Sequence, residues 1–314
     1  MGEDRVRLAL IGCGAHAESA HARPLAHFAG RNPGFVRLAA ACDIDSERAG
    51  RFCREYGFAA AYSDVEAMLN AEKLDAVISV LPIEKIAEVG STLLRSGIPC
   101  VLEKPPGRSL EEVNALAELA RKTCAPHMVS MNRRFSPYLN RAVAWTKGIG
   151  SLRYVRGQML RHARREDDFL WGTGVHIVDA VRYIGGEIAA YEVHCLEDGP
   201  QPTPWHLITL RFASGCTGCI EIFPTTGAVS EKFELYGEGF RAEARTMGPP
   251  GESVRCWKEG ALVVEEAADP GAPLFLRDGS YEETSSFLYA LRDRKPLRPT
   301  LDDVLPSLEL CGRR

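Results

Sequence analysis

A short apolar run followed at once by closely spaced glycines is the feature that most constrains the fold of this chain. The run from Arg7 to Ile11 is typical of a buried strand, and a helix-forming stretch follows soon after it. Gly12, Gly14 and Ala17 lie between them in the spacing Gly-x-Gly-x-x-Ala. The first glycine permits a tight turn, the second lets the backbone approach a phosphate, and the small alanine lets a helix pack on the strand. The pattern predicts a pyrophosphate cradle, although a glycine pair in this position is often only a turn.

An acidic residue at the end of the next apolar run supports the cradle. The run from Val36 to Cys42 ends at Asp43, where a ribose-binding acid falls in a strand-helix-strand unit. The Asp43 carboxylate can accept two hydrogen bonds from an adenosine ribose and would repel a 2′-phosphate. We therefore expect NAD as the cofactor. NADP stays open as an alternative because Arg48 lies one turn into the next predicted helix.

Strands and helices alternate through roughly the first 125 residues. Asp45 is a predicted N-cap, and Ser63 and Ser109 each begin a capping-box pattern. The predicted strands cover 7–11, 36–43, 74–81, 99–103 and 127–131, and the longer predicted helices cover 18–30, 46–56, 84–95 and 109–123. This alternation predicts a Rossmann-type dinucleotide-binding domain over residues 1–125, with a doubly wound parallel sheet of about six strands.

Beyond Asn132 the pattern changes to consecutive strands separated by short turns. Two helices are predicted over 137–146 and 176–184, and a third begins near Leu301. The predicted strands cover 152–159, 189–195, 206–212, 216–223, 232–236, 241–246, 254–257 and 262–265. These elements predict an α+β domain over residues 126–314 with a large, mostly antiparallel sheet. Since two helices cannot cover such a sheet, we expect its open face to be the interface of a homodimer or homotetramer.

Composition excludes several classes of partner. The net charge of −4 leaves no basic excess for binding nucleic acid. No apolar run approaches the roughly 20 residues of a membrane span, and the first residues lack a signal-peptide layout, so we expect no membrane contact and a cytoplasmic location. The ten cysteines are scattered as in a reducing compartment, and only Cys216 and Cys219 form a Cys-x-x-C. We expect no metal site.

A lysine at the end of a predicted parallel strand is the main candidate for chemistry. Glu103, Lys104 and Pro105 lie at the edge where open α/β sheets bind ligands. In an extended segment Glu103 and Lys104 point to opposite sides, so the acid need not neutralise the amine. Because the ordinary pKa of lysine is about 10.4, a lysine base requires desolvation or a nearby positive charge that lowers this pKa. The alternative is a surface lysine before a proline turn.

Several further motifs follow in a fixed order. After the cradle and Asp43 come the Gly97–Pro105 segment with Glu-Lys-Pro, the stretch Asn132-Arg133-Arg134-Phe135, the segment from Gly174 to Asp179, and the segment from Tyr281 to Phe287. Together these motifs resemble the Gfo/Idh/MocA family of NAD(P)-dependent oxidoreductases, which act on sugars, inositols and related molecules. The similarity spans nearly the whole chain.

The resemblance implies roles for particular residues. Lys104 matches the catalytic lysine of the family, and His176 matches the histidine that contacts the reacting hydroxyl or carbonyl, a buried capped histidine being the alternative. The implied cofactor contacts are Gly12, Gly14, Ala15, His16, Asp43, Leu81, Pro82, Glu103, Lys104 and Arg134. The implied substrate contacts are Lys104, Asp168, Trp171 and His176.

The chain departs from the family pattern at two positions. Many members carry an aspartate four residues before the histidine, where this chain has Gly172. Asp167 or Asp168 is a candidate replacement, and a solvated charge run is the alternative. Ile86 stands where the family usually carries a histidine after the proline that ends the fourth strand, which favours a less typical substrate.

These features predict hydride transfer between a sugar, inositol or related polyol and a nicotinamide, with Lys104 as general base and His176 orienting the oxygen. One alternative is a non-catalytic NAD-binding sensor or co-regulator on the same fold. Another is an epimerase or glycosidase in which the bound NAD is recycled. Arg161, Arg164 and Arg165 are candidates for binding an anionic substrate group, with solvated or interface roles as the alternative.

Overall fold

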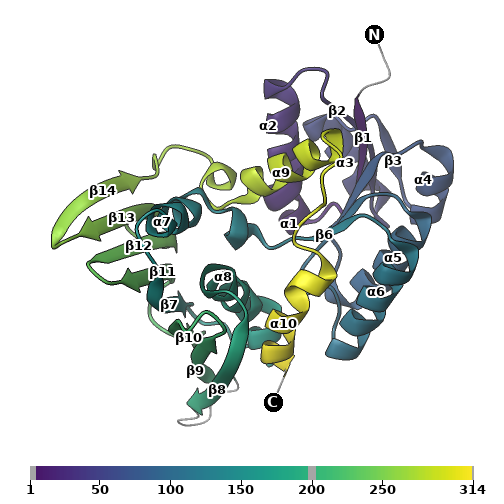
Figure 1. Cartoon of the computed structure of the whole chain (residues 1–314). Helices are drawn as coiled ribbons and strands as arrows, with labels where there is room; N and C mark the ends of the chain where they lie inside the picture. Colours follow the sequence, from purple (N-terminus) through teal and green to yellow (C-terminus); the bar gives the residue numbers. More distant parts are fainter. Residues whose placement is uncertain (1–4, 197–202, 313–314) are drawn as a thin grey trace. The chain divides into compact units, whose positions relative to one another are not determined.

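The structure, a computed structural model, describes residues 5–196 and 203–312 (Figure 1). The chain divides into two compact units: unit 1 comprises Met1–Ser130 and Ser280–Pro306, and unit 2 comprises Met131–Gly279 and Ser307–Arg314. This division differs from the predicted domains 1–125 and 126–314, because a segment near the carboxyl end returns to unit 1. In that segment α9 (Ser280–Arg292) packs against α2 (Arg23–Arg31), where Tyr289 and Phe28 meet edge to face with 5.5 Å between ring centroids.

Unit 1 is built on a six-stranded parallel sheet with the order β3-β2-β1-β4-β5-β6. The strands are β1 (Val6–Ile11), β2 (Val36–Cys42), β3 (Ala60–Tyr62), β4 (Ala76–Ser79), β5 (Cys100–Leu102) and β6 (His127–Val129). Consecutive side chains from Leu8 to Ile11 are buried, as expected when helices cover both faces of a parallel sheet. The strand order reverses between β1 and β4. The predicted doubly wound sheet is confirmed, with the short edge strand β3 added to it.

The helices of unit 1 begin and end at recognisable caps. They are α1 (Ala15–Ala17), the π-helical segment η1 (Glu18–Ala22), α2, α3 (Ser46–Tyr56), α4 (Val65–Ala71), α5 (Ile83–Ser96), α6 (Leu110–Thr123) and α9. Asp45 caps α3 and Ser109 caps α6, as predicted. The prediction for α4 was wrong by one residue, because Asp64 and not Ser63 accepts the capping hydrogen bond, from the Ala67 N–H at 2.7 Å.

Unit 2 contains an eight-stranded sheet with the order β14-β13-β12-β11-β7-β10-β9-β8. The strands are β7 (Leu152–Leu160), β8 (Ile188–Leu196), β9 (Trp205–Phe212), β10 (Thr217–Phe223), β11 (Ser230–Gly237), β12 (Phe240–Met247), β13 (Ser253–Lys258) and β14 (Ala261–Ala267). Among the strand pairs that the structure describes in this sheet, only β7 and β10 are parallel, so the predicted mostly antiparallel sheet is confirmed. The remaining elements are η2 (Asn132–Phe135), α7 (Pro137–Lys147), the π-helical segment η3 (Leu170–Gly174), α8 (Val175–Gly185), η4 (Leu274–Leu276) and α10 (Leu301–Gly312), which begins in unit 1.

The two faces of the unit 2 sheet differ in chemistry. Helix α7 packs on β11, β12 and β13, and α8 packs on β7 and β10 (Figure 1). The face that these helices cover is mainly apolar and buried. The other face carries a network of charges. In this network Arg156 binds Glu221 at 2.6 and 2.8 Å and Glu234 at 3.3 Å, while Arg241 binds Glu234 and Glu243 at 2.7 Å each. None of the described helices is long and apolar enough to cross a membrane.

Candidate cofactor-binding and catalytic site

Gly12 forms the tight turn that ends β1. Its φ of +87° lies in the left-handed region, and an ideal Cβ there would lie 1.8 Å from the Val80 carbonyl oxygen. The Gly12 N–H donates to the Cys42 carbonyl at 2.7 Å, and the Val80 N–H donates to the Ile11 carbonyl at 2.8 Å. The turn therefore lies between the ends of β2 and β4, and no side chain fits at position 12.

Gly14 faces open space at the start of the first helix. It is the N-cap of α1, and an ideal Cβ on it would meet no described atom within 4 Å. Its φ of −83° and ψ of −179° are open to any residue, so the fold of the loop does not require a glycine here. The first N–H groups of a helix lack partners within the helix. An open space beside such groups fits the pyrophosphate of a dinucleotide.

The Asp43 carboxylate is tied to the glycine turn. Its Oδ2 accepts a hydrogen bond from the Cys13 N–H at 2.8 Å, and its Oδ1 accepts one from the Asp45 N–H at 2.9 Å. A carboxylate has about four acceptor positions, so two remain for other donors. The Arg48 guanidinium lies 3.9 Å from Asp43 Oδ2 and donates to Asp45 at 2.9 Å. The predicted ribose acceptor thus stands at the glycine turn, with one arginine beside it.

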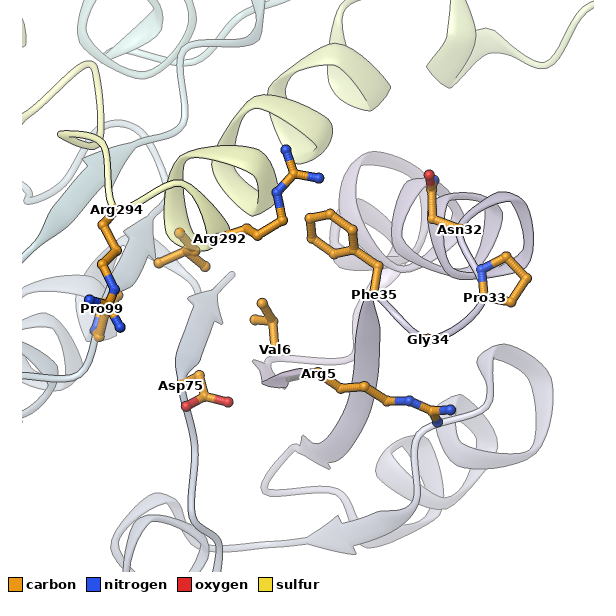
Figure 2. A pocket seen from close by; sticks show the side chains of 11 residues that line it. Arg5, Val6, Asn32, Pro33, Gly34, Phe35, Asp75, Pro99, Arg292 and Arg294 are labelled. Carbon is orange, nitrogen blue, oxygen red and sulfur yellow. The ribbon is translucent and has the colours of Figure 1, made fainter. Parts of the chain in front are cut away.

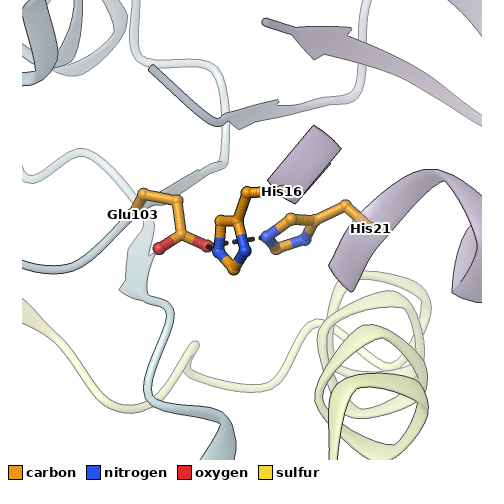
Figure 3. A group of neighbouring side chains, drawn as sticks. All are labelled: His16, His21 and Glu103. Carbon is orange, nitrogen blue, oxygen red and sulfur yellow. Dashed lines mark hydrogen bonds and ion pairs between the residues drawn. The ribbon is translucent and has the colours of Figure 1, made fainter. Parts of the chain in front are cut away.

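A buried carboxylate at the end of β5 joins separate parts of unit 1 (Figure 3). Glu103 is 4% exposed, and its Oε1 contacts His21 Nε2 at 2.8 Å and His16 Nε2 at 3.2 Å. Its Oε2 accepts a hydrogen bond from the Lys104 backbone N–H at 3.0 Å. Burial raises the pKa of Glu103, but the hydrogen bonds from His16 and His21 outweigh burial and hold this pKa well below its usual range. Glu103 is therefore an ionised acceptor, which requires both imidazoles to donate through Nε2–H.

The π-helical segment η1 explains how both imidazoles reach the same oxygen. His16 and His21 are five residues apart, and in a regular α-helix such residues lie about 140° apart around the axis. The wider turn of η1, over Glu18–Ala22, brings them closer to one face. Their rings meet edge to face with 6.2 Å between centroids. Of the two π-helical segments that the structure describes, η1 begins two residues after His16 and η3 contains Trp171, and such segments are frequent at functional sites.

The group of His16, His21 and Glu103 also has the composition of a metal site. Among the described residues it is the one set of three or more such side chains whose ligand atoms lie within 4.8 Å of one another. The contacts of 2.8 and 3.2 Å to Glu103 Oε1 are ordinary hydrogen-bond lengths. A tetrahedral Zn²⁺ ion with bonds of about 2.05 Å would hold its ligand atoms about 3.3 Å apart. We therefore describe the group as a hydrogen-bonded cluster.

In unit 2 the predicted substrate contacts lie around η3 and the start of α8. Trp171 is 8% exposed, His176 is half-buried and Asp168 is exposed. An ideal Cβ at Gly172 would lie 3.8 Å from Asp168 Oδ2, and the Gly172 N–H donates to the Asp168 carbonyl at 2.8 Å. The Asp168 carboxylate therefore lies beside the place that a side chain at position 172 would take.

Arg134 is held by a buried carboxylate of its own unit. Its guanidinium donates two hydrogen bonds of 2.7 Å to Asp179, which is 1% exposed. Asp179 Oδ1 also accepts a hydrogen bond from the Ser307 hydroxyl at 3.0 Å. A paired, two-point contact of this kind fixes the plane of the guanidinium. The place of Arg134 in the cofactor site stays a prediction.

The candidate anion-binding arginines of unit 2 differ in their partners. Arg161 binds the buried Glu231, which also accepts hydrogen bonds from Arg133 at 2.8 and 3.0 Å. Burial raises the pKa of Glu231, but Arg133 and Arg161 outweigh burial and lower it to about 2. Arg164 binds Glu166, and Arg165 is exposed. Arg161 is thus an ion-pair partner of the fold, and the surface position of Arg165 fits a solvated role.

The remaining predicted site residues lie beside the glycine turn or in the first turns of α1 and α5. Leu81 Cδ2 lies 3.5 Å from the point that a Cβ of Gly12 would occupy, and Pro82 is the N-cap of α5. Ile86, in the position of the missing family histidine, is 2% exposed. Ala15 opens α1. Lys104 belongs to unit 1 and His176 to unit 2, and their convergence on one point stays a prediction.

His21 is the member of the cluster around Glu103 that the sequence analysis did not identify. It is 82 positions from Glu103, and no local pattern connects the two. The available signal was a second histidine in the helix that follows the cradle, but a five-residue spacing does not place it beside His16 in a regular helix.

A pocket of about 850 Å³ lies at the amino ends of the strands of the unit 1 sheet (Figure 2). Its lining includes Val6, the first residue of β1, together with Asp75 and Pro99, which directly precede β4 and β5. Arg292 lies over the Phe35 ring at 5.0 Å from its centroid. Open α/β sheets bind their ligands at the carboxyl ends of the strands, so this pocket is not the cofactor site.

Comparisons with known proteins agree with the geometry of unit 1. Residues 6–131 match the model of the Gfo/Idh/MocA oxidoreductase family, NAD-binding Rossmann fold. D-apiose dehydrogenase of Paraburkholderia graminis is 27% identical over 197 residues, which cover 59% of this chain and 51% of that protein. D-glucoside 3-dehydrogenase of Escherichia coli is 28% identical over 212 residues, which cover 62% and 58%. The matched stretches thus span between half and three fifths of these two relatives.

The solved structures extend the likeness to the whole fold. An oxidoreductase from Agrobacterium radiobacter, in complex with NAD+, L-tartaric acid and magnesium, has a TM-score of 0.79 and 18% identity, with 98% of this chain and 94% of that chain covered. At this identity the likeness concerns the fold alone. Residues 6–131 are thus similar to the NAD-binding domain of the Gfo/Idh/MocA oxidoreductases, the family that the motifs of the sequence resemble.

Proposed function

We propose that this protein is an NAD-dependent dehydrogenase that oxidises a CH–OH group of a sugar, inositol or related polyol. The observation that carries the proposal is the arrangement at the carboxyl edge of the unit 1 sheet. There Gly14 faces open space, Asp43 stands at the glycine turn, and Lys104 follows β5. This edge, at the topological switch point, is where doubly wound sheets bind dinucleotides.

The residues that would hold NAD are those of the turn and its surroundings. The backbone around Gly14 would receive the pyrophosphate, and Asp43 would accept the ribose hydroxyls with its remaining lone pairs. Leu81 and Pro82 would line the cofactor beside the turn. When bound, NAD supplies the carbon that accepts the hydride.

Cofactor choice gives a testable prediction. Asp43→Asn removes the negative charge but keeps an oxygen that can accept the Cys13 N–H, and Arg48 lies close by. We expect the ratio of the Kd for NADPH to the Kd for NADH to fall by at least about tenfold, since repulsion of the 2′-phosphate is removed. Fluorescence titration with both reduced cofactors measures this ratio. Asp75→Asn, at the other edge of the sheet, is the matched control, and an unchanged ratio in Asp43→Asn would argue against a ribose contact.

In the proposed reaction Lys104, as a neutral amine, takes the proton of the substrate hydroxyl, and His176 donates a hydrogen bond to the same oxygen. Asp168 supports His176 in place of the aspartate that many relatives carry at position 172. The position of the Asp168 carboxylate beside Gly172 supports this role. Trp171 would line the substrate pocket.

Purified protein incubated with NAD and a panel of sugars, inositols and other polyols tests the proposal, with absorbance of the reduced cofactor as the readout. We expect turnover with at least one polyol, and a lower kcat in Asp168→Asn with that polyol. Bound NAD with no turnover on any substrate would favour the sensor. Product formation without net reduced cofactor would favour the recycling epimerase or glycosidase.

We also propose that the protein is cytoplasmic and forms a homodimer or homotetramer through the unit 2 sheet. The open face with its half-buried charge network supports the assembly, because a second copy would cover it. Analytical ultracentrifugation checks this, since a particle of 34.5 kDa would contradict it. The ten free thiols fit a reducing compartment.

A further inference from the structure

We propose that Glu103, held by His21 and His16, is a positioning residue that fixes the backbone of Lys104 at the carboxyl edge of the unit 1 sheet. The inference rests on the proposed function, in which Lys104 is the general base. It adds His21, which neither the motifs nor the geometry of a dinucleotide site would select, to the residues on which turnover depends.

The backbone leaves the sheet after β5, at the point where the Glu103 carboxylate binds the Lys104 amide. We call this contact the anchor. The last sheet hydrogen bonds are those from the Glu103 N–H to Ser79 at 3.2 Å and from the Ser130 N–H to Leu102 at 2.8 Å. Two prolines follow Lys104, and proline has no N–H. The Lys104 amide is thus the only backbone donor between Glu103 and Gly107, and it donates to the Glu103 carboxylate at 3.0 Å.

The carboxylate is held in place by donors from a different segment. His21 is 2% exposed and contacts Glu103 Oε1 at 2.8 Å, while His16 is largely exposed and contacts the same oxygen at 3.2 Å (Figure 3). A buried ionised carboxylate is costly unless donors surround it. The π-helical turn that carries His21 to this oxygen serves the cluster and is not required by the strand order of the sheet.

The cluster therefore joins the phosphate loop to the backbone of Lys104, two parts of the site whose relative position must be fixed for the reaction. His16 lies within the cradle, two residues after Gly14, and Glu103 directly precedes Lys104. A displacement of about 1 Å at a reacting group can lower turnover by about a hundredfold. An anchor shared by the phosphate loop and the lysine backbone would prevent such a displacement.

The test compares His21→Leu with His21→Gln. Leucine removes the donor, whereas glutamine carries an N–H donor close to the position of the imidazole Nε2. Hydrogen exchange of the Lys104 amide, followed by mass spectrometry, needs no substrate. We expect exchange at least about tenfold faster in His21→Leu and close to wild type in His21→Gln. With the polyol found in the panel, we expect kcat to fall by about a hundredfold in His21→Leu, with KM and the Kd for NADH nearly unchanged.

His127→Leu is the matched control. His127 is a half-buried histidine of the same unit whose ring binds the Ala125 carbonyl at 2.9 Å and the Leu301 N–H at 3.1 Å. Its loss should lower thermal stability without changing Lys104 exchange or kcat. If His21→Leu does not fold, His16→Leu replaces it in the exchange measurement, which needs no cofactor, because that side chain is 60% exposed.

Two outcomes would overturn the inference. One is unchanged Lys104 exchange in a folded His21→Leu, and the other is faster exchange with unchanged kcat, which would make the anchor structural only. Failure of the proposed function has a different signature: the wild-type protein would then oxidise no polyol of the panel, while the exchange of the Lys104 amide in His21→Leu and His21→Gln would still show whether the cluster holds the Lys104 backbone.

Discussion

Replacement of Lys104 by methionine is expected to lower kcat by at least about a hundredfold, the low end of general-base contributions, while the Kd for NADH stays unchanged. Methionine has a similar length and no titratable group, so it removes the proton acceptor but keeps most of the packing. The backbone N–H that donates to Glu103 at 3.0 Å is present in the variant. Steady-state kinetics with the polyol found in the panel, together with NADH titration, measures both quantities.

Lys104→Arg separates a base from a mere positive charge. Arginine keeps the charge but is not deprotonated in proteins, so we expect the same loss of kcat as in the methionine variant. Lys122→Met is the matched control, because Lys122 is 69% exposed near the end of α6. Full activity of Lys104→Arg would show that Lys104 acts through its charge, and full activity of Lys104→Met would remove it from the reaction.

Gly12→Ala is expected to lower the free energy of unfolding by about 3 kcal/mol or more. The new Cβ would lie 1.8 Å from the Val80 carbonyl oxygen, and the φ of +87° adds strain for any residue with a side chain. The neighbouring atom is backbone, so it can move only if β4 moves with it. Chemical denaturation, with the loss of circular dichroism as the readout, measures the change.

Gly14→Val should have the opposite profile. A Cβ there meets no described atom within 4 Å, and the extended dihedral angles suit a β-branched residue. We expect stability close to wild type and a Kd for NADH at least about tenfold higher, because the side chain takes the space of the pyrophosphate. Gly30→Ala, in a similarly open position on α2, should leave the Kd unchanged. Wild-type NADH affinity in Gly14→Val would contradict the cradle.

The features that the sequence predicted correctly depend on interactions between residues that are close together in the chain. The turn at Gly12, the N-cap at Asp45 and all strands of the two sheets except β3 depend on residues a few positions apart, so periodicity and capping patterns identified them. The helix after the cradle was predicted as a single regular helix, and the structure inserts the π-helical turn η1. Nothing in the sequence around His16 and His21 indicates that turn.

Contacts between distant residues had no such signal. Arg134 and Asp179 are 45 positions apart, and both were assigned to motifs without any indication that they bind each other. Likewise, the return of α9 to unit 1 rests on aromatic packing between Tyr289 and Phe28, which are separated by most of the chain. Such pairs arise only when the fold brings two elements together.

The order of elements, the class of each sheet and the position of the cradle were therefore written in the residues themselves, because short-range sterics and apolar periodicity act within one element. The tertiary structure alone decided which charges are buried and paired, including the cluster of His16, His21 and Glu103 behind Lys104. The physical reason is desolvation: a buried carboxylate is stable only with donors around it, and here the two imidazole donors come from a segment more than eighty positions away.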